Sequence, residues 1–437
     1  MRIAVIGSGV SGLGAAYALK DTAEVVLYEK DARLGGHART VTIDYDGAAI
    51  DVDTGFIVYN ERNYPNRVGL FEALGVESLE TDMSFAFAGR GVEWSSNFPT
   101  GVFAQKRNLA SPKFLKMLAD IARFNRLAPA DLAAGKLENL TVGGYLNRLG
   151  LSDEFRDHYL LPMGAAIWST TDGGVAEAPA TSFIGFFANH NLLQMAQPKW
   201  RTVQGGSRAY VQRIAALLGP RVRTGAGVAR IRRGPAGVEV TDARGCTDRF
   251  DQVILACHSD QALRMLSDAD TEERAFLGAV RYGPNRAYLH RDPRLMPRRR
   301  AAWGSWNALS GEDGGSLTYW MNSLQNIDAK RPLFVSLNPD AAPDPALTFE
   351  VFDCEHPQFD TTALAAQRQI GRIQGRGGVW YAGAWLGHGF HEDGLTAGLR
   401  AAMALGGAVP WDFVDHRIPG GPLRAARPAT SVRRAAA

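Results

Sequence analysis

A glycine pattern between the first expected strand and the first expected helix constrains this chain more than any other feature. Residues 2–6 form a short apolar run, and Gly7-Ser-Gly9-Val-Ser-Gly12 follows directly and matches G-x-G-x-x-G. An alanine-rich helical stretch continues to Lys20, and residues 24–29 have the composition of a second strand. This order of elements indicates a βαβ unit.

Each glycine of the pattern has its own physical task. Gly7 permits a tight turn, Gly9 lets a pyrophosphate approach the backbone, and Gly12 lets helix and strand pack closely. Unpaired N–H groups at the start of the helix, near Ser11, face the phosphate oxygens. Taken alone, the pattern is equally typical of an ordinary tight connection between a strand and a helix.

Glu29 makes a dinucleotide the favoured ligand. It follows the second strand, where a carboxylate would accept hydrogen bonds from ribose hydroxyls. A carboxylate there would also repel a 2′-phosphate, which argues against NADP. The glycine pattern and Glu29 together predict dinucleotide binding, with Lys30 beside the ligand, and leave NAD and FAD open.

Composition narrows the class of protein. With 437 residues, 46% of them hydrophobic, the chain is long enough for two domains with their own cores. A formal charge of +3 with scattered arginines argues against nucleic acid as a partner.

The three cysteines have no metal-ligand spacing, so we expect no metal site and no disulfide framework. We expect a cytoplasmic protein, since neither a secretory leader nor a membrane-spanning run is evident.

Changes in composition and in expected secondary structure along the chain predict a discontinuous arrangement of two domains. The fold class is α/β: a helix-rich, mixed-sheet substrate domain is inserted discontinuously into a Rossmann-type dinucleotide-binding domain, which we call the FAD-binding domain because the segments described next favour FAD. We assign the FAD-binding domain to residues 1–62, 201–262 and 374–415. We assign the substrate domain to residues 63–200 and 263–373, and a flexible tail to residues 416–437.

The segments after Glu29 favour FAD. They read Arg33-Leu-Gly35-Gly36-His37-Ala-Arg39-Thr40 and Asp53-Thr-Gly55-Phe-Ile-Val-Tyr59. With Gln204-Gly-Gly206 and the stretch from Tyr381-Ala-Gly383 to Gly398, the whole chain resembles the flavin-containing amine oxidase and phytoene desaturase superfamily. The resemblance implies FAD as cofactor, with contacts from Arg33, Gly35, Gly36, His37, Gly55, Phe56, Val228 and Gly383.

Three departures from the family pattern weaken an amine substrate without weakening FAD binding. His37 stands where an arginine is usual, and Phe390 stands where an aromatic-cage tyrosine is usual. Ala384 and Trp385 occupy the place of an acidic residue.

The resemblance also implies that the last helix directs its N-terminus at the pyrimidine end of the flavin. Glu392, Asp393 and Leu395 occupy that first turn and are expected to contact the cofactor. The alternative is an ordinary helix cap by Asp393.

No pair of residues identifies a catalytic base. The candidates are Tyr59, which the resemblance places near the flavin, and His388 and His391, which flank the final strand-to-helix turn. A single histidine is more often a structural hydrogen-bonding residue, so the catalytic assignment stays open.

A narrower resemblance suggests the substrate. Residues 285–292, 302–307 and 385–394 resemble bacterial flavoproteins that accompany cyclopropane-fatty-acid-synthase-like methyltransferases, including the acyl dehydrogenase of furan fatty acid synthesis. This implies dehydrogenation of a methyl-branched acyl chain, still esterified in phospholipid. Apolar clusters at residues 183–195 and 303–320 would suit a tunnel for such a chain, although they equally suit a plain core.

Basic residues could bring the protein to the inner face of a membrane as a peripheral protein. Lys113, Lys116, Arg123, Arg126 and the run Arg298–Arg300 could meet anionic lipid head groups, or form a solvated helix face.

Two other functions stay open. A flavin amine oxidase would have an aromatic cage and usually a lysine near the reactive flavin atom N5, and the later chain offers only Lys199 and Lys330. A non-catalytic FAD-binding partner of a lipid-modifying enzyme would have a closed or filled cavity.

Overall fold

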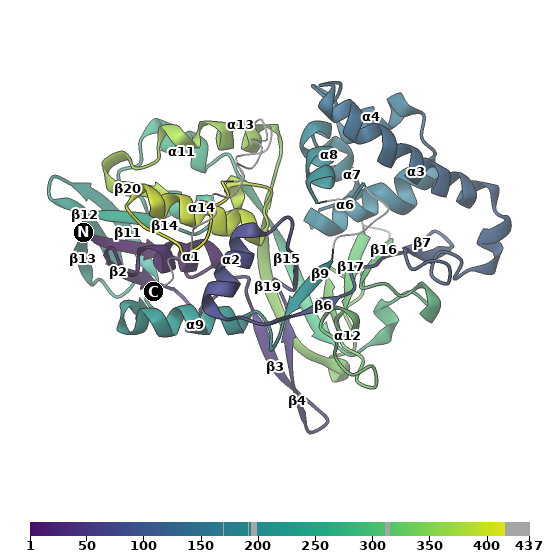
Figure 1. Cartoon of the computed structure of the whole chain (residues 1–437), viewed down its shortest axis with the longest axis horizontal. Helices are drawn as coiled ribbons and strands as arrows, with labels where there is room; N and C mark the ends of the chain where they lie inside the picture. The colour runs from purple at the N-terminus through teal and green to yellow at the C-terminus, as the bar shows by residue number, and fades with distance from the viewer. Residues whose placement is uncertain (169, 191, 194–198, 311–314, 416–437) are drawn as a thin grey trace, which may run out of the picture.

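A five-stranded parallel sheet forms the centre of the lobe on the left of Figure 1. The computed structural model describes residues 1–168, 170–190, 192–193, 199–310 and 315–415. The strands lie in the order β10 (Val222–Arg223), β2 (Glu24–Tyr28), β1 (Arg2–Ile6), β14 (Gln252–Leu255) and β20 (Val379–Tyr381). Ile3, Val5 and Val25 are fully buried because helices cover both faces of such a sheet.

Three helices pack against this sheet: α1 (Val10–Leu19), α9 (Arg208–Leu218) and α14 (His391–Ala404). Helices α1 and α14 approach closely because each places a glycine against the other helix. A Cβ at Gly398 would lie 2.0 Å from the carbonyl oxygen of Ser11, and one at Gly14 would lie 2.5 Å from Leu395. The last helix therefore rests directly on the helix that follows the glycine pattern.

A seven-stranded mixed sheet runs through the second lobe. Its order is β19 (Thr348–Gln358), β15 (Arg281–His290), β18 (Phe334–Leu337), β17 (Gly315–Trp320), β16 (Trp306–Ser310), β7 (Phe85–Gly89) and β8 (Val92–Ser95). β16 and β7 pair in parallel, and the other neighbours are antiparallel.

Helices gather at the outer end of this lobe, on the right of Figure 1. They include α3 (Pro112–Ala133), α4 (Val142–Leu149), α6 (Leu161–Trp168), α7 (Asp172–Glu177) and α8 (Ala180–Asn189). Phe114 and Phe124 of α3 are buried among them, whereas Leu118 and Ile121 of the same helix are half-buried. None of the helices in these described ranges is both long enough and apolar enough to span a bilayer.

The observed architecture confirms the predicted fold class. The parallel sheet takes its strands from residues 2–28, 222–255 and 379–381, and the seven-stranded sheet takes its strands from residues 85–95 and 281–358. The chain thus crosses between the lobes several times, as a discontinuous insertion requires. The domain limits given above stay predictions, and the predicted tail at residues 416–437 lies outside the described residues.

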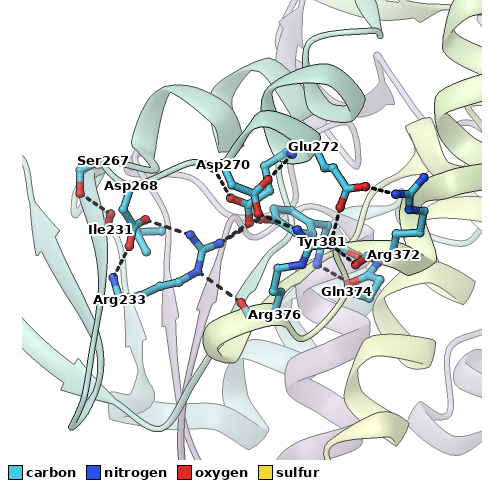
Figure 2. Close-up of polar contacts among 11 residues, drawn as sticks. Ile231, Arg233, Ser267, Asp268, Asp270, Glu272, Arg372, Gln374, Arg376 and Tyr381 are labelled. Carbon is cyan, nitrogen blue, oxygen red and sulfur yellow. Dashed lines mark hydrogen bonds and ion pairs between the residues drawn. The ribbon is translucent and has the colours of Figure 1, made fainter.

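A polar network fixes the end of β20 to a three-stranded sheet formed by β11 (Val228–Gly234), β12 (Gly237–Asp242) and β13 (Thr247–Phe250) (Figure 2). Arg233 of β11 forms ion pairs with Asp268 and with the fully buried Glu273 of α11 (Thr271–Leu277). The Tyr381 hydroxyl donates to Glu273 at 2.6 Å, and Arg376 binds Asp270 and Glu272 of the same region. Burial and the Glu273 carboxylate raise the pKa of Tyr381, which therefore stays a neutral donor.

We expect Glu273→Ala to destabilise the fold strongly, since it leaves Arg233 and the buried Tyr381 hydroxyl without their shared acceptor. The loss in the free energy of unfolding should be about 2–4 kcal/mol. Asp21→Ala, which removes an exposed ion pair with Lys20, should cost less than about 1 kcal/mol. Urea unfolding followed by tryptophan fluorescence measures both; equal losses in the two variants would contradict the role of the network.

Candidate active site

A cavity of about 1320 Å³ runs from the carboxyl edge of the parallel sheet into the second lobe. Its walls include Gly9 at the first strand-to-helix turn, Phe56 in the middle, and Trp168 among the helices. Ordinary small-molecule pockets measure roughly 300–1,000 Å³. The cavity therefore has room for an extended cofactor and a second molecule.

The end of the cavity beside the parallel sheet fits a diphosphate. Gly7 has a φ of +102°, and a Cβ there would lie 2.6 Å from the carbonyl oxygen of Ala256. A Cβ at Gly36 would lie 3.0 Å from the Cα of Gly9, whereas a Cβ at Gly9 would meet nothing within 4 Å. The two glycine turns thus close against each other and leave bare backbone and the start of α1 facing the cavity.

Glu29 is held in place at this end by the first turn. One of its carboxylate oxygens accepts from the backbone N–H of Ser8 at 3.0 Å and from the Ser8 hydroxyl at 2.5 Å. The other oxygen accepts from the backbone N–H of Asp31 at 3.0 Å. Glu29 lines the cavity, so its remaining acceptor capacity is available to ribose hydroxyls, and the residues present fit a dinucleotide.

Most of the predicted cofactor residues line this cavity. They are Gly7, Gly9, Ser11, Glu29, Lys30, Arg33, Gly36, His37, Gly55, Phe56, Val228 and Gly383. Gly12 and Gly35 do not line it, because they serve packing: a Cβ at Gly12 would lie 1.8 Å from the Gly7 carbonyl oxygen, and one at Gly35 would lie 2.5 Å from that of Ala38. Contact of the lining residues with FAD itself stays a prediction.

The structure corrects the expectation for the first turn of the last helix. Glu392 points away from the cavity and caps α2 (Pro65–Leu74), accepting from the N–H groups of Asn66 and Arg67 at 2.8 and 3.1 Å. Burial raises the pKa of Glu392 to about 7. Asp393 accepts from the Phe390 N–H at 2.9 Å, which is the helix cap given above as the alternative. Leu395 packs on α1 through Gly14, so the helix reaches the cavity through Phe390 and His391 instead.

Tyr59 also lies outside the cavity, contrary to the prediction. Its ring packs against Tyr64 and Phe71, and its hydroxyl donates to Ser78 Oγ at 2.9 Å. The neighbouring Val58 lines the cavity. Because side chains alternate along a strand, Val58 and Tyr59 of β5 (Val58–Asn60) point to opposite sides.

His388 and His391, the other two catalytic candidates, both line the cavity. The His391 ring stacks on Phe56 at 4.0 Å between centroids, and its Nε2 lies 3.3 Å from the Tyr210 hydroxyl. Burial lowers the pKa of His388 to about 4, and burial lowers that of His391 well below its usual range. Both rings are therefore neutral near pH 7 and able to accept a proton.

Sequence reasoning missed two further histidines beside His37. His258 stacks on Tyr282 at 4.1 Å, and the His356 ring lies 5.3 Å from that of His37. Burial, with the nearby His37, lowers the pKa of His258 to about 4 and that of His356 to about 3. His258 directly follows β14, and the carboxyl ends of parallel strands border the ligand site, a signal that was available in the sequence.

The part of the cavity inside the second lobe, here called the chamber, is lined by uncharged and mainly apolar side chains. They are Met83, Phe85, Trp94, Ser96, Tyr159, Met163, Ile167, Trp168, Phe186, His190, Leu192, Trp306, Tyr319, Val335 and Leu337. Phe186 lies at the end of the chamber that meets the cofactor site, and its ring centroid is 4.7 Å from that of Trp168 and 4.7 Å from that of Phe390. Asp353 and Glu355, which also line the cavity, are exposed on β19.

Comparisons with known proteins agree with this site. Residues 10–300 match the model of the flavin-containing amine oxidoreductase family. A Mycobacterium tuberculosis protein that carries the name flavin-containing monoamine oxidase AofH is 28% identical over 260 residues. That match covers 56% of this chain and 54% of the relative, so the chain matches only about half of that protein's length.

Solved structures share the fold at low sequence identity. Putrescine oxidase bound to putrescine has a TM-score of 0.66 at 17% identity, covering 93% of this chain and 99% of that one. A fatty acid isomerase from P. acnes that produces CLA has a TM-score of 0.66 at 15% identity, covering 92% and 98%. The family match covers well over half of the chain, and the cavity fits a dinucleotide. The chain therefore belongs to the flavin-containing amine oxidoreductase family, a family of oxidoreductase enzymes, and its cofactor is FAD.

Proposed function

We propose that this protein is an FAD-dependent oxidoreductase that introduces a double bond into a hydrophobic acyl chain. In its finer form, the substrate is a methyl-branched fatty acyl chain of a membrane phospholipid, in furan fatty acid biosynthesis. The main observation in support of this proposal is the uncharged chamber that continues from the FAD site. The narrower sequence resemblance supports it, and so does the fatty acid isomerase of similar fold, since that fold serves a fatty acid there.

The chamber favours an acyl chain over a cation on physical grounds. Each methylene that leaves water for an apolar environment gains roughly 0.8 kcal/mol. An ammonium group would lose its hydration in the chamber and find no carboxylate among the residues that line it. The acidic side chains of Asp353 and Glu355 lie at the exposed strand β19 and cannot compensate that charge deep in the chamber.

His388 is the residue best placed to take the proton. Its ring lies 5.6 Å from that of Phe186, where the chamber meets the cofactor site, and burial keeps it neutral. Bound FAD supplies a hydride acceptor, the flavin N5. The chamber walls hold the chain and exclude water, while a ring nitrogen of His388 takes the proton from the carbon beside the one that loses hydride. The electron pair of that second C–H bond then forms the carbon–carbon double bond.

Amine oxidation is the second candidate, because three aromatic rings lie where an amine would meet the flavin. The Phe186 ring stacks on that of Phe390 and meets that of Trp168 edge-on, and such rings could attract a cation through their faces. Neither lysine that the later chain offers is buried at the cavity: Lys199 is exposed and pairs with Glu80 at 3.7 Å, and Lys330 is exposed. The open chamber also counts against a non-catalytic partner, which we expected to have a closed or filled cavity.

Anaerobic mixing of the FAD-loaded protein with candidate substrates tests the proposal. We expect a methyl-branched phospholipid in detergent micelles to bleach the flavin absorbance, and a panel of amines to leave it unchanged, because the chamber solvates an acyl chain and not a cation. Stopped-flow absorbance is the measurement. Bleaching by an amine alone, or by neither class, would contradict the proposed function.

We expect His388→Gln to slow flavin reduction by about 10²–10⁴-fold, the usual contribution of a general base. FAD content should be unchanged, because His388 lies at the chamber end of the cofactor site. Tyr59→Phe is the matched control, since that hydroxyl binds Ser78 outside the cavity and its loss should change the rate less than about twofold. Equal rates in wild type and His388→Gln would remove His388 from the mechanism.

The pH dependence of the same rate gives a second readout for His388. A base must be neutral to accept a proton, and the pKa of His388 is lowered to about 4. The rate of flavin reduction should therefore be flat near pH 7 and fall only as the pH drops through about 4. This fall in rate at low pH should be absent in His388→Gln. A fall in rate centred near pH 6.5 in the wild type would contradict the assignment.

A further inference from the structure

Basic and large apolar side chains are exposed on segments of the second lobe that adjoin the chamber wall. The segments are the loop of residues 97–100, the short helix η1 (Lys106–Ala110), the start of α3 and the segment Arg298–Arg300, and we call them together the basic-apolar face. We propose that this face docks the protein on an anionic phospholipid bilayer. The inference deepens the proposed function and rests on it, because a bilayer is the source of the esterified acyl chain.

Large apolar side chains are exposed on this face. Phe98 is 79% exposed, Leu109 57% and Leu115 45%. These three fall within 18 consecutive residues, yet they make up three of the eight large apolar side chains that are exposed in the described ranges. Apolar side chains gathered in this way, rather than scattered singly, are typical of a surface that meets a partner or a membrane.

The charge of the face suits an anionic partner. Residues 97–119 contain four basic residues, Lys106, Arg107, Lys113 and Lys116, and no acidic residue, in a chain with 45 acidic residues overall. Arg298–Arg300 add three positive charges on the adjoining segment. Some of this charge is compensated, because Lys113 pairs with Glu154 at 3.4 Å, Lys116 with Asp120 at 3.0 Å and Arg299 with Glu93 at 3.3 Å.

The side chains of Lys106 and Arg298 are available to bind an anionic partner. Both are exposed, and neither forms an ion pair with any residue that the structure describes. Positive charge interleaved with exposed apolar side chains is the combination that holds peripheral proteins at anionic bilayers, where the apolar groups enter the interface and the cations meet head groups. A nucleic acid would use the charge and leave Phe98, Leu109 and Leu115 in water.

The face is directly connected to the chamber. Strand β8 (Val92–Ser95) carries Trp94, whose ring lines the chamber and packs on Phe114 of α3 at 6.3 Å. The chain then passes through Ser96, also in the chamber wall, to the exposed loop that bears Phe98. On the other side, the Arg299 N–H donates to Glu93 of the same strand at 3.0 Å. A bilayer at this face would therefore lie within a few residues of the chamber wall.

Co-sedimentation of the FAD-loaded full chain with vesicles tests the inference without any turnover. We expect binding to phosphatidylcholine vesicles that contain phosphatidylglycerol, weaker binding to phosphatidylcholine alone, and loss of binding as salt is raised. Lys106→Glu combined with Arg298→Glu should lower the partition coefficient at least about tenfold. Phe98→Ser combined with Leu109→Ser should do the same at any salt concentration.

A matched control reverses one charge and removes one apolar side chain elsewhere. Arg274→Glu with Leu217→Ser, exposed on α11 and α9 of the lobe that contains the parallel sheet, should bind vesicles like the wild type. Absence of vesicle binding by the wild type, or equal losses in the control and in the face variants, would overturn the inference. If micellar lipid still bleaches the flavin in that case, the proposed function survives while the docking face does not.

Discussion

The hydrogen bonds between Ser8 and Glu29 are the contact on which the rest of the site depends. The Ser8 backbone and hydroxyl both donate to the carboxylate, and the same hydroxyl accepts from the Gly35 N–H at 3.1 Å. One residue therefore joins the first glycine turn, the ribose acid and the second glycine turn into a single rigid cradle. The backbone of Gly9 stays bare beside it, because a Cβ there would meet nothing within 4 Å, and this space would accommodate the phosphates.

The remaining walls of the site come from distant parts of the chain. Strands β14 and β20 bring residues 256–258 and 383–391 to the same carboxyl edge as the first turn. The network around Glu273 holds Tyr381, which lies two residues before the cavity-lining Gly383. A contact outside the cavity therefore helps to position part of the cavity wall. Beyond this edge the second lobe supplies a chamber in which the described lining side chains are uncharged, and burial lowers the pKa of His388 where the chamber meets the cofactor end. Cofactor and substrate sites thus differ sharply in polarity within one cavity.

The sequence predicts the cofactor end well because that end is local. Gly7, Gly9 and Glu29 act through backbone turns and a carboxylate whose positions follow from one βαβ unit. Prediction failed for Tyr59, which strand alternation directs to the side opposite Val58, and for Glu392, whose contact with α2 no local pattern reveals. For Asp393, the local alternative given by the sequence, a cap of its own helix, is the one that the structure shows. His356 was missed because only the folded sheet brings it beside His37, whereas His258 could have been found from its position just after a strand of the parallel sheet. The chamber also depends on contacts between segments more than 100 residues apart, such as the pairing of Phe85 in β7 with Trp306 in β16.

Titration of the FAD-free protein with FAD tests the central claim most directly, namely that Glu29 and the two glycine turns form a dinucleotide cradle. Calorimetry should show one FAD per chain, with FMN bound far more weakly because it lacks the ribose that Glu29 holds. Glu29→Gln should weaken FAD binding by about tenfold to a hundredfold, the effect of losing a charged acceptor, whereas Glu24→Gln at the start of the same strand should not. Equal affinity for FMN and FAD, or full FAD affinity in Glu29→Gln, would contradict the account.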